Sequence, residues 1–576
     1  MKYIFACLLC LNLFGGYGQT LPTLFETSQA RETPDYWEII RWWKTLDQHS
    51  DKVHLRTMGM TDAGQPLHLA VVSQAGDTDF ERMRKENKRV ILVNNGIHPG
   101  EPDGIDASML LARDIAFGKI RMPDQLVLAI IPVYNIGGCL DRSPDYRVDQ
   151  NGPEAFGFRG NSQNLDLNRD FIKCDSKEAR AFAEIFHLAD PDVFLDNHVS
   201  NGADYQHIMT LICSQHNKLG GIMGEFMNKD FEPGIYASMK KKGYDLIPYV
   251  NAFGDRVDQG WPEFMDGPRY SSGYAALWHS FSFVAETHML KAYDQRVQAT
   301  YELMLSFMDF TSGHSKQIKE LREATKNQVK SQREFTITWN PDRTRSSERL
   351  YKGYESGYRK SEVSGLDRLY YDRTRPYEKT IPFYNHYLPG QKVQKASAYV
   401  IPQGWWKVID LLRLNKVNMM PLDRDTLMEV EVYRIEEYES SSRPFEGHHI
   451  NTKVRTSISV GKMSFRKGDY LVPLDQVANR FLVEVLEPAA PDSYFTWNFF
   501  DAVLGQKEGY SAYAFEDIAA EYLQRHPDLK EKLAERRQSD STFARSARAQ
   551  LYYVYEHSPW IEPAFMRYPV YRVNNQ

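Results

Sequence analysis

The sequence is poor in cysteine, which excludes a scaffold held together by disulfides. It has five cysteines in 576 residues, and Cys7 and Cys10 lie in an apolar segment at the N-terminus. The other three, Cys139, Cys174 and Cys213, allow at most one bridge, and the sequence does not select the pair. A chain of this length with 42% hydrophobic residues can bury large cores without covalent crosslinks.

The sequence also lacks a strong excess of either charge and, after the N-terminus, any long apolar run. The formal net charge is −6 and the pI is near 6.3, so the basic footprint of a nucleic-acid-binding protein is missing. We predict no nucleic-acid partner. We also predict no transmembrane segment in the mature chain, because no later apolar run is long enough to cross a bilayer.

The first 18 residues have the pattern of a secretory signal peptide. Lys2 is followed by an apolar run over residues 3–14, and Gly16 and Gly18 are small residues at the positions that a signal peptidase reads. The run is too short to span a membrane. The pattern predicts that residues 1–18 are removed and that the protein is secreted or periplasmic.

Up to about residue 310, short apolar runs alternate with segments of helical periodicity. This alternation predicts an α/β sheet with helices on its faces. The expected strands are residues 89–94, 126–133, 191–196 and 281–285, and the expected helices are residues 104–117 and 176–188, the second capped by Ser176.

The composition changes after the charged, helix-compatible stretch at residues 314–334. Polar and apolar residues then alternate, which is typical of half-buried strands. We predict a catalytic domain over residues 19–335 and a β-rich C-terminal accessory region over residues 336–576. His448 and His449 lie in a polar stretch of this region and are expected to be solvated.

Four residues follow or end predicted strands and have the chemistry of a metal site. His98 and Glu101 come three residues apart after the first expected strand, a spacing that lets an imidazole and a carboxylate face one ion. Taken alone this is a weak signal, since about one His-x-x-Glu match is expected by chance. His198 and Glu286 occupy the same kind of position, and sites in open α/β sheets form beyond the carboxyl ends of strands. Two histidines and one carboxylate leave an open position on zinc, and a further carboxylate can accept a proton.

Together with the stretches GFRGN and NLDLNRD, this pattern resembles the zinc metallocarboxypeptidases of the carboxypeptidase A-like family over roughly residues 36–310. The resemblance implies a mixed central sheet with helices on both faces, and one zinc ion per chain held by His98, Glu101 and His198. Where that family has Asn-Pro-Asp-Gly, this chain has NIGG at residues 135–138.

The resemblance also implies roles for the residues around the metal. Glu286 is the expected general base and Arg159 the group that polarises the carbonyl. Asp166 is expected to orient His98. Three further residues are expected to bind the substrate, namely Asn168 and Arg169 on the terminal carboxylate and Tyr270 as the covering tyrosine, with Tyr274 as its rival.

We therefore expect a zinc-dependent hydrolase that releases C-terminal residues from peptides with a free terminal carboxylate. Two alternatives remain open. One is a zinc amidohydrolase acting on peptidoglycan stem peptides or acylated amino acids, and the other is a zinc scaffold that binds peptide ends without cutting them. Glu286 and Arg159 argue against the scaffold, because binding alone requires neither residue.

Overall fold

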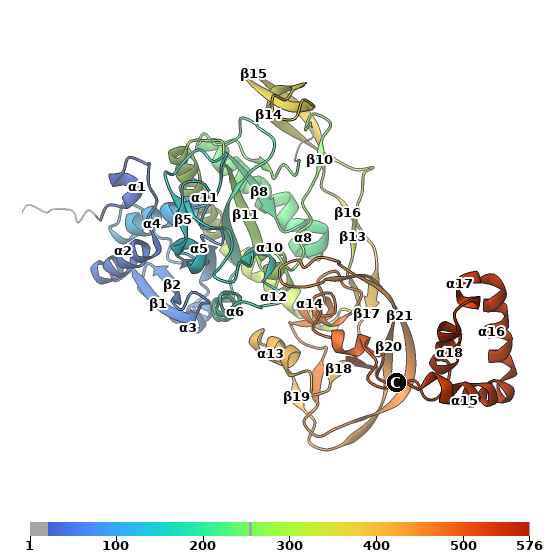
Figure 1. The fold of residues 1–576 in the computed structure, drawn as a ribbon. Helices are drawn as coiled ribbons and strands as arrows, with labels where there is room; N and C mark the ends of the chain where they lie inside the picture. The colour runs from blue at the N-terminus through green and yellow to red at the C-terminus, as the bar shows by residue number, and fades with distance from the viewer. Residues whose placement is uncertain (1–20, 253–255, 575–576) are drawn as a thin grey trace, which may run out of the picture.

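The computed structural model describes residues 21–252 and 256–574 (Figure 1). The predicted signal peptide lies outside the described residues. Cys139, Cys174 and Cys213 are buried free thiols, so the single bridge that the sequence allowed does not form. A search of the described helices finds none that combines the length and the apolar character of a membrane span.

A mixed sheet of eight strands forms the centre of the N-terminal part. Its order is β1-β2-β4-β3-β7-β11-β8-β9, in which β3, β4, β7 and β11 run parallel and β2 and β8 run antiparallel to their inner neighbours. The strands are β1 (Val53–Met60), β2 (Pro66–Ser73), β3 (Arg89–Asn94), β4 (Leu126–Ile131), β7 (Val193–Ser200), β8 (Met209–Cys213), β9 (Ile247–Pro248) and β11 (Phe281–His288).

Helices cover both faces of this sheet, as predicted. Thr287 of β11 donates to Asp103 at the start of α4 (Asp103–Ala116), whereas Ser282 of the same strand donates to Ser272 of α10 (Ser271–Leu277). Positions 282 and 287 are an odd number of residues apart, so they point to opposite faces. The face with α4 also holds α11 (Tyr293–Gly313) and α9 (Glu232–Lys241), and the face with α10 holds α6 (Lys177–Ala189).

The buried strands and the helix caps explain why these elements form where they do. Every residue of β3, β4 and β7 is buried, as expected for strands covered on both faces. The predicted cap of α6 is confirmed, because the Ser176 side chain accepts from the amide of Ala179. Asp35 caps α2 (Tyr36–His49) in the same way through Glu38.

The C-terminal part is β-rich, with a second sheet of six strands in the order β19-β22-β18-β23-β20-β21. A separate long hairpin, β14–β15, pairs with β10 and projects from the body of the molecule (Figure 1). Four helices, α15 to α18, have their own apolar core and stand apart from both sheets (Figure 1). The bounds are β10 (Trp261–Pro262), β14 (Ser347–Lys360), β15 (Asp367–Tyr384), β18 (Ala398–Ile401), β19 (Met420–Pro421), β20 (Thr426–Ser440), β21 (Asn451–Phe465), β22 (Tyr470–Pro473), β23 (Tyr571–Val573), α15 (Ala512–Arg525), α16 (Pro527–Ser539), α17 (Ser541–Ala544) and α18 (Ala547–Glu556).

Shorter or connecting elements complete the described chain. They are α1 (Leu24–Thr27), α3 (Phe80–Lys85), α5 (Ile136–Leu140), β5 (Arg142–Ser143), β6 (Phe156–Gly157), η1 (Leu167–Arg169), α7 (His216–Leu219), α8 (Gly221–Phe226), η2 (Met227–Phe231), α12 (Ser315–Ser331), β12 (Glu334–Thr336), β13 (Trp339–Pro341), β16 (Tyr387–Pro389), β17 (Lys392–Gln394), α13 (Trp406–Leu414), α14 (Asn479–Leu486) and η3 (Asp501–Leu504).

Strand β23 holds the second sheet together at its centre. It pairs with β18 on one side and with β20 on the other. Arg572 of β23 is buried and donates to the hydroxyl of Tyr433 at 2.7 Å and to Glu487 at 2.9 Å. It also lies 3.1 Å from a carboxylate oxygen of Glu431. A buried guanidinium with such partners stays charged without an uncompensated desolvation cost.

Candidate metal centre and active site

The carboxyl ends of three adjacent parallel strands bring the predicted residues to one edge of the large sheet. His98 and Glu101 lie in the turn after β3, His198 lies on β7 and Glu286 lies on β11. Glu286 is the register partner of His198 across the β7–β11 pair. This is the edge at which open α/β sheets form their sites.

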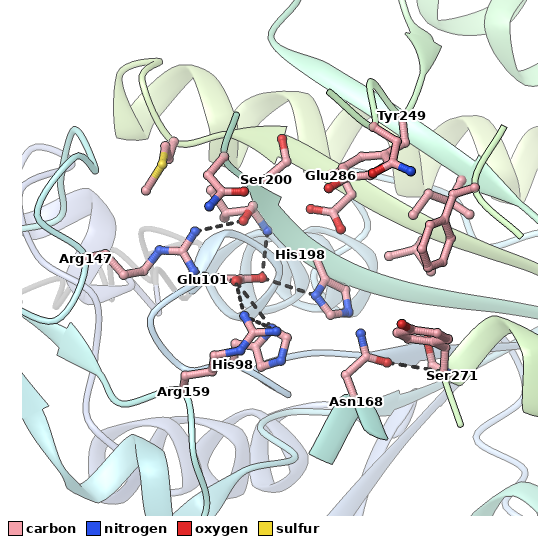
Figure 2. A pocket seen from close by; sticks show the side chains of 18 of the residues that line it. His98, Glu101, Arg147, Arg159, Asn168, His198, Ser200, Tyr249, Ser271 and Glu286 are labelled. Atoms are coloured by element: carbon pink, nitrogen blue, oxygen red, sulfur yellow. Dashed lines mark hydrogen bonds and ion pairs between the residues drawn. The ribbon is translucent and has the colours of Figure 1, made fainter. Parts of the chain in front are cut away.

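His98, Glu101 and His198 form one buried cluster that fits a metal ion. One ligand atom from each lies within 4.8 Å of the others. The Nδ1 atom of His98 is 3.3 Å from Oε1 of Glu101, and the Nδ1 atom of His198 is 3.2 Å from Oε2 of the same carboxylate. Figure 2 shows the three side chains turned toward one another, with Glu286 pointing into the same space.

The outer nitrogen of each histidine is held by a carboxylate. Nε2 of His98 is 2.9 Å from Asp166, and Nε2 of His198 is 2.9 Å from Asp196. Such partners fix the ring and its tautomer, so that the inner nitrogen is free to bind a metal. The sequence interpretation named Asp166 but missed Asp196. A signal for it exists, because residues 196 and 198 are two apart on a strand and so share a face.

Charges within the cluster shift the pKa of its members in opposite directions. Burial by itself raises the pKa of Glu101, but Arg147 and His98 outweigh it and hold that pKa well below its usual range. Burial lowers the pKa of His198, but Asp196 and Glu101 outweigh it and raise that pKa well above its usual range. The metal-free site therefore favours a charged carboxylate and an imidazolium, and a bound cation would take the place of the imidazolium proton.

Arg147 is a member of the site that sequence reasoning missed. Its guanidinium donates to Oε1 of Glu101 at 2.5 Å and to the carbonyl oxygen of Val199 at 2.9 Å. A Cβ at Gly100 would lie 3.0 Å from Cδ of Arg147, so glycine there leaves room for the arginine beside the cluster. Arg147 lies in a long loop between β5 and β6, where no periodicity marks a functional residue.

Glu286 and Arg159 flank the cluster. Burial raises the pKa of Glu286 above its usual range, while the nearby charge of His198 opposes the shift. A bound dication would oppose it further and favour the carboxylate that a general base requires. Arg159 donates to Asp166 through Nη2 at 2.9 Å, and its Nη1 lies 3.3 Å from Nδ1 of His98.

A cavity of about 690 Å³ joins the cluster to the residues expected to bind substrate. Its lining includes the eight residues that the sequence singled out as metal ligands, catalytic groups or substrate contacts, and it adds Arg147, Tyr249 and Asn251. Asn168 and Ser271 meet on its wall, where the amide of Ser271 donates to Oδ1 of Asn168 at 3.3 Å (Figure 2).

The structure decides which of the two candidate tyrosines, Tyr270 or Tyr274, lies at the cavity. Tyr270 lines the cavity, and its ring lies 4.6 Å below the guanidinium of Arg169. Tyr274 is fully buried in the core and donates to Asn415 at 2.6 Å. Only Tyr270 of the pair can therefore reach a molecule in the cavity.

Comparison with known proteins finds a family that the N-terminal part resembles. Residues 39–201 match the family model described as zinc carboxypeptidase. This segment is therefore similar to the zinc carboxypeptidase family. The matched segment includes His98, Glu101, Asp166 and His198, whereas Glu286 lies beyond it.

Several solved structures are similar to about half of the chain. A metallo-carboxypeptidase from Burkholderia cenocepacia is 13% identical over 48% of this chain and 69% of its own, with a TM-score of 0.37. One from Pseudomonas aeruginosa, in complex with (2-guanidinoethylmercapto)succinic acid, is 13% identical over 49% and 69%, with a TM-score of 0.37. Carboxypeptidase A from Helicoverpa armigera is 15% identical over 49% and 74%, with a TM-score of 0.36. No curated protein matches the sequence significantly.

The donor set of the segment that matches the zinc carboxypeptidase model fits a zinc ion. Two imidazole nitrogens and one carboxylate are the ligands of hydrolytic zinc sites, which keep a position open. Both histidines have the carboxylate partner that such sites use to orient the ring. His98, Glu101 and His198 are thus the residues that would hold zinc.

Asp166→Ala should weaken zinc binding without abolishing it, because the ligands remain and only the orientation of His98 is lost. Changes of this kind cost about 10–100-fold in metal affinity or activity. Competition against a chromophoric chelator measures the affinity directly. Asp410→Ala is the control, since that carboxylate pairs with exposed Arg413 on α13. Equal zinc affinity in wild type and Asp166→Ala would remove Asp166 from the site.

Proposed function

We propose that the protein is a zinc-dependent carboxypeptidase that acts, after export, on peptides with a free C-terminal carboxylate. The observation that carries the proposal is the shared cavity. His98, Glu101 and His198 line it together with Glu286, and Arg169 lies on the same wall. One end thus suits a metal and a base, and the other suits an anion.

The guanidinium of Arg169 is available for that anion. Its neighbour Asp170 is occupied by Lys173 at 2.9 Å and by the hydroxyl and amide of Ser176. Arg169 instead donates to the carbonyl oxygen of Asn168, and its Nη1 lies 3.8 Å from a carboxylate oxygen of Asp166, beyond hydrogen-bond distance. A planar guanidinium suits the bidentate binding of a carboxylate. These contacts argue against the alternative in which Arg169 merely braces its loop through Asp170.

An apolar surface lies beside this anion site. Val284 is two residues before Glu286 on β11, so both point to the same face, and Val284 pairs with Ile212 of β8. Both residues line the cavity, as does Phe264. Peptides that end in an apolar residue are therefore the substrates to test first.

The proposed reaction divides among the chain's own residues. Zinc, when bound, supplies a Lewis acid that polarises a carbonyl and lowers the pKa of water. Glu286 takes the proton of the attacking water and returns it to the leaving amine. Arg159 stabilises the negative charge that develops on the carbonyl oxygen. Asn168 and Arg169 hold the terminal carboxylate so that the last peptide bond lies between these groups.

Matched peptides that differ only at the C-terminus test the proposal. A free-acid peptide ending in Phe should be hydrolysed roughly 10- to 150-fold faster, as kcat/KM, than its amide, because a neutral amide forfeits a charged hydrogen bond to Arg169. Arg169→Met should lose most of this preference while zinc content stays unchanged. Mass spectrometry of the products shows whether single C-terminal residues are released.

Three results would contradict the carboxypeptidase proposal. Equal rates on both peptides would leave a hydrolase but end the carboxypeptidase proposal. Internal cuts, or cleavage confined to peptidoglycan stem peptides or acylated amino acids, would favour an amidohydrolase. Zinc binding with no turnover on any peptide would favour a binding scaffold. Arg413→Met, which alters an exposed arginine of α13, is the matched control for the Arg169 variant.

A further inference from the structure

The loop between β20 and β21 reaches from the C-terminal region to the segment that carries Asn168 and Arg169. Its Glu446 accepts a hydrogen bond at 2.7 Å from the backbone amide of Asp166. Its His448 lies 2.8 Å from a carboxylate oxygen of Asp175. Asp166 and Asp175 lie on either side of η1, so the C-terminal region holds this turn at both ends. The expectation that His448 is solvated is wrong, because its ring is half-buried against Trp497 and paired with a carboxylate.

The C-terminal region also contacts the segment that carries Tyr270, through Asp492. Asp492 accepts from Nε of Arg269 at 2.7 Å and from the indole of Trp497 at 3.2 Å. The guanidinium of Arg269 also lies 5.0 Å from the Trp497 ring. A Cβ at Gly267 would lie 2.8 Å from Asp492, so only glycine lets the carboxylate approach this closely.

The two held segments meet at the proposed carboxylate site. Arg169 stacks on Tyr270, and the amide of Ser271 donates to Asn168. Trp497 contacts both segments, because the ammonium of Lys173 lies 5.5 Å from its ring on the side of η1. Side chains of the C-terminal region therefore fix the distance between the segment of Asn168 and Arg169 and the segment of Tyr270, which carry the groups that would bind a substrate.

We propose that the C-terminal region is a positioning element of the terminal-carboxylate site, an inference that rests on the proposed carboxypeptidase function. Glu446, His448, Asp492 and Trp497 form what we call the C-terminal brace. None of these four residues is among the described lining of the cavity or in the metal cluster, so the brace acts by fixing Asn168, Arg169 and Tyr270. Misplacement of binding groups by about 1 Å can cost on the order of 10²-fold in rate, so such support matters for catalysis.

Glu446→Ala should raise KM for the free-acid peptide by about 3- to 10-fold, because one hydrogen bond to the turn is lost. We expect kcat to change by less than about twofold and zinc content to stay the same, since the Asp166 carboxylate keeps its contacts with His98 and Arg159. Glu446→Gln should restore the wild-type KM, because the amide oxygen still accepts from the Asp166 amide. The control Glu437→Ala removes an exposed pair with Arg455 on the same hairpin and should change nothing.

Hydrogen exchange gives a second measurement that needs no substrate. Peptides covering residues 165–175 should exchange faster in Glu446→Ala and in His448→Ala than in wild type, because the Asp166 amide loses its acceptor or the turn loses its anchor. Peptides covering residues 266–272 should exchange faster in Asp492→Asn. Unchanged exchange together with unchanged KM would overturn the brace. Wild-type protein that does not prefer the free acid would overturn the carboxypeptidase proposal instead, and the exchange rates would still decide whether the brace holds these segments.

Discussion

Glu286→Gln should keep zinc and bind substrate but lower kcat by about 10²–10⁴-fold, the usual contribution of a general base. The amide has the size of the carboxylate and cannot take a proton from water. Glu286 lines the cavity beside the cluster and pairs in register with His198, so no change in the position of the metal ligands is needed to explain the loss.

Steady-state kinetics on the free-acid peptide, together with metal analysis, measures this effect. Glu81→Gln is the control, because Glu81 forms an exposed pair with Lys85 on α3. A rate near that of wild type, with zinc retained, would show that Glu286 is structural. The base would then have to be sought among the other carboxylates of the cavity, and Asp149 is the one outside the metal cluster among the lining residues that the structure describes.

His198→Ala should abolish stoichiometric zinc binding and, with it, turnover. The change removes one of three ligands and also takes the imidazole from the buried carboxylate of Asp196, whose other oxygen accepts only from the neutral side-chain amide of Asn94 among its described side-chain partners. A buried carboxylate that loses its partner destabilises the protein, so the variant is also expected to unfold at a lower temperature.

Metal analysis after dialysis gives the zinc content of His198→Ala, and thermal unfolding gives an independent measure. Zinc at 100 times its Kd should stabilise the wild-type protein by about 2.7 kcal/mol and the variant not at all. His49→Ala is the control, because that ring only contacts a backbone carbonyl on the surface of α2. One zinc per chain in His198→Ala would remove this residue from the metal site.

The elements around the site were predictable because their signals are local. Residues 90–93 are apolar without a break, and the strand predicted over residues 89–94 forms β3 with those bounds. The expected strand at residues 126–133 is β4, which ends two residues earlier. The strand ends also carry the candidate ligands, so the metal cluster could be anticipated from sequence order alone.

The rest of the site depends on contacts that no local pattern records. Arg147 reaches Glu101 from a loop, and Glu446 reaches Asp166 from the other part of the chain. The sequence could not decide between Tyr270 and Tyr274 either. The two residues are four positions apart at the start of one short helix, yet Tyr270 lines the cavity and Tyr274 is buried in the core. Pairing between distant segments decides each of these cases.

The position of β23 has a consequence for the order in which the molecule can be assembled. It is the last described strand in the sequence, and it lies between β18 and β20 in the second sheet. During synthesis β18 and β20 emerge before β23, so neither can pair with it until the end of the chain is made. Pairing between strands so far apart in the sequence is slow to form. The loop that carries Glu446 connects β20 and β21, so we expect its contact with Asp166 to form only after β23 docks. The edge of the first sheet that carries the metal cluster can thus fold early, while the contact from the C-terminal region forms late.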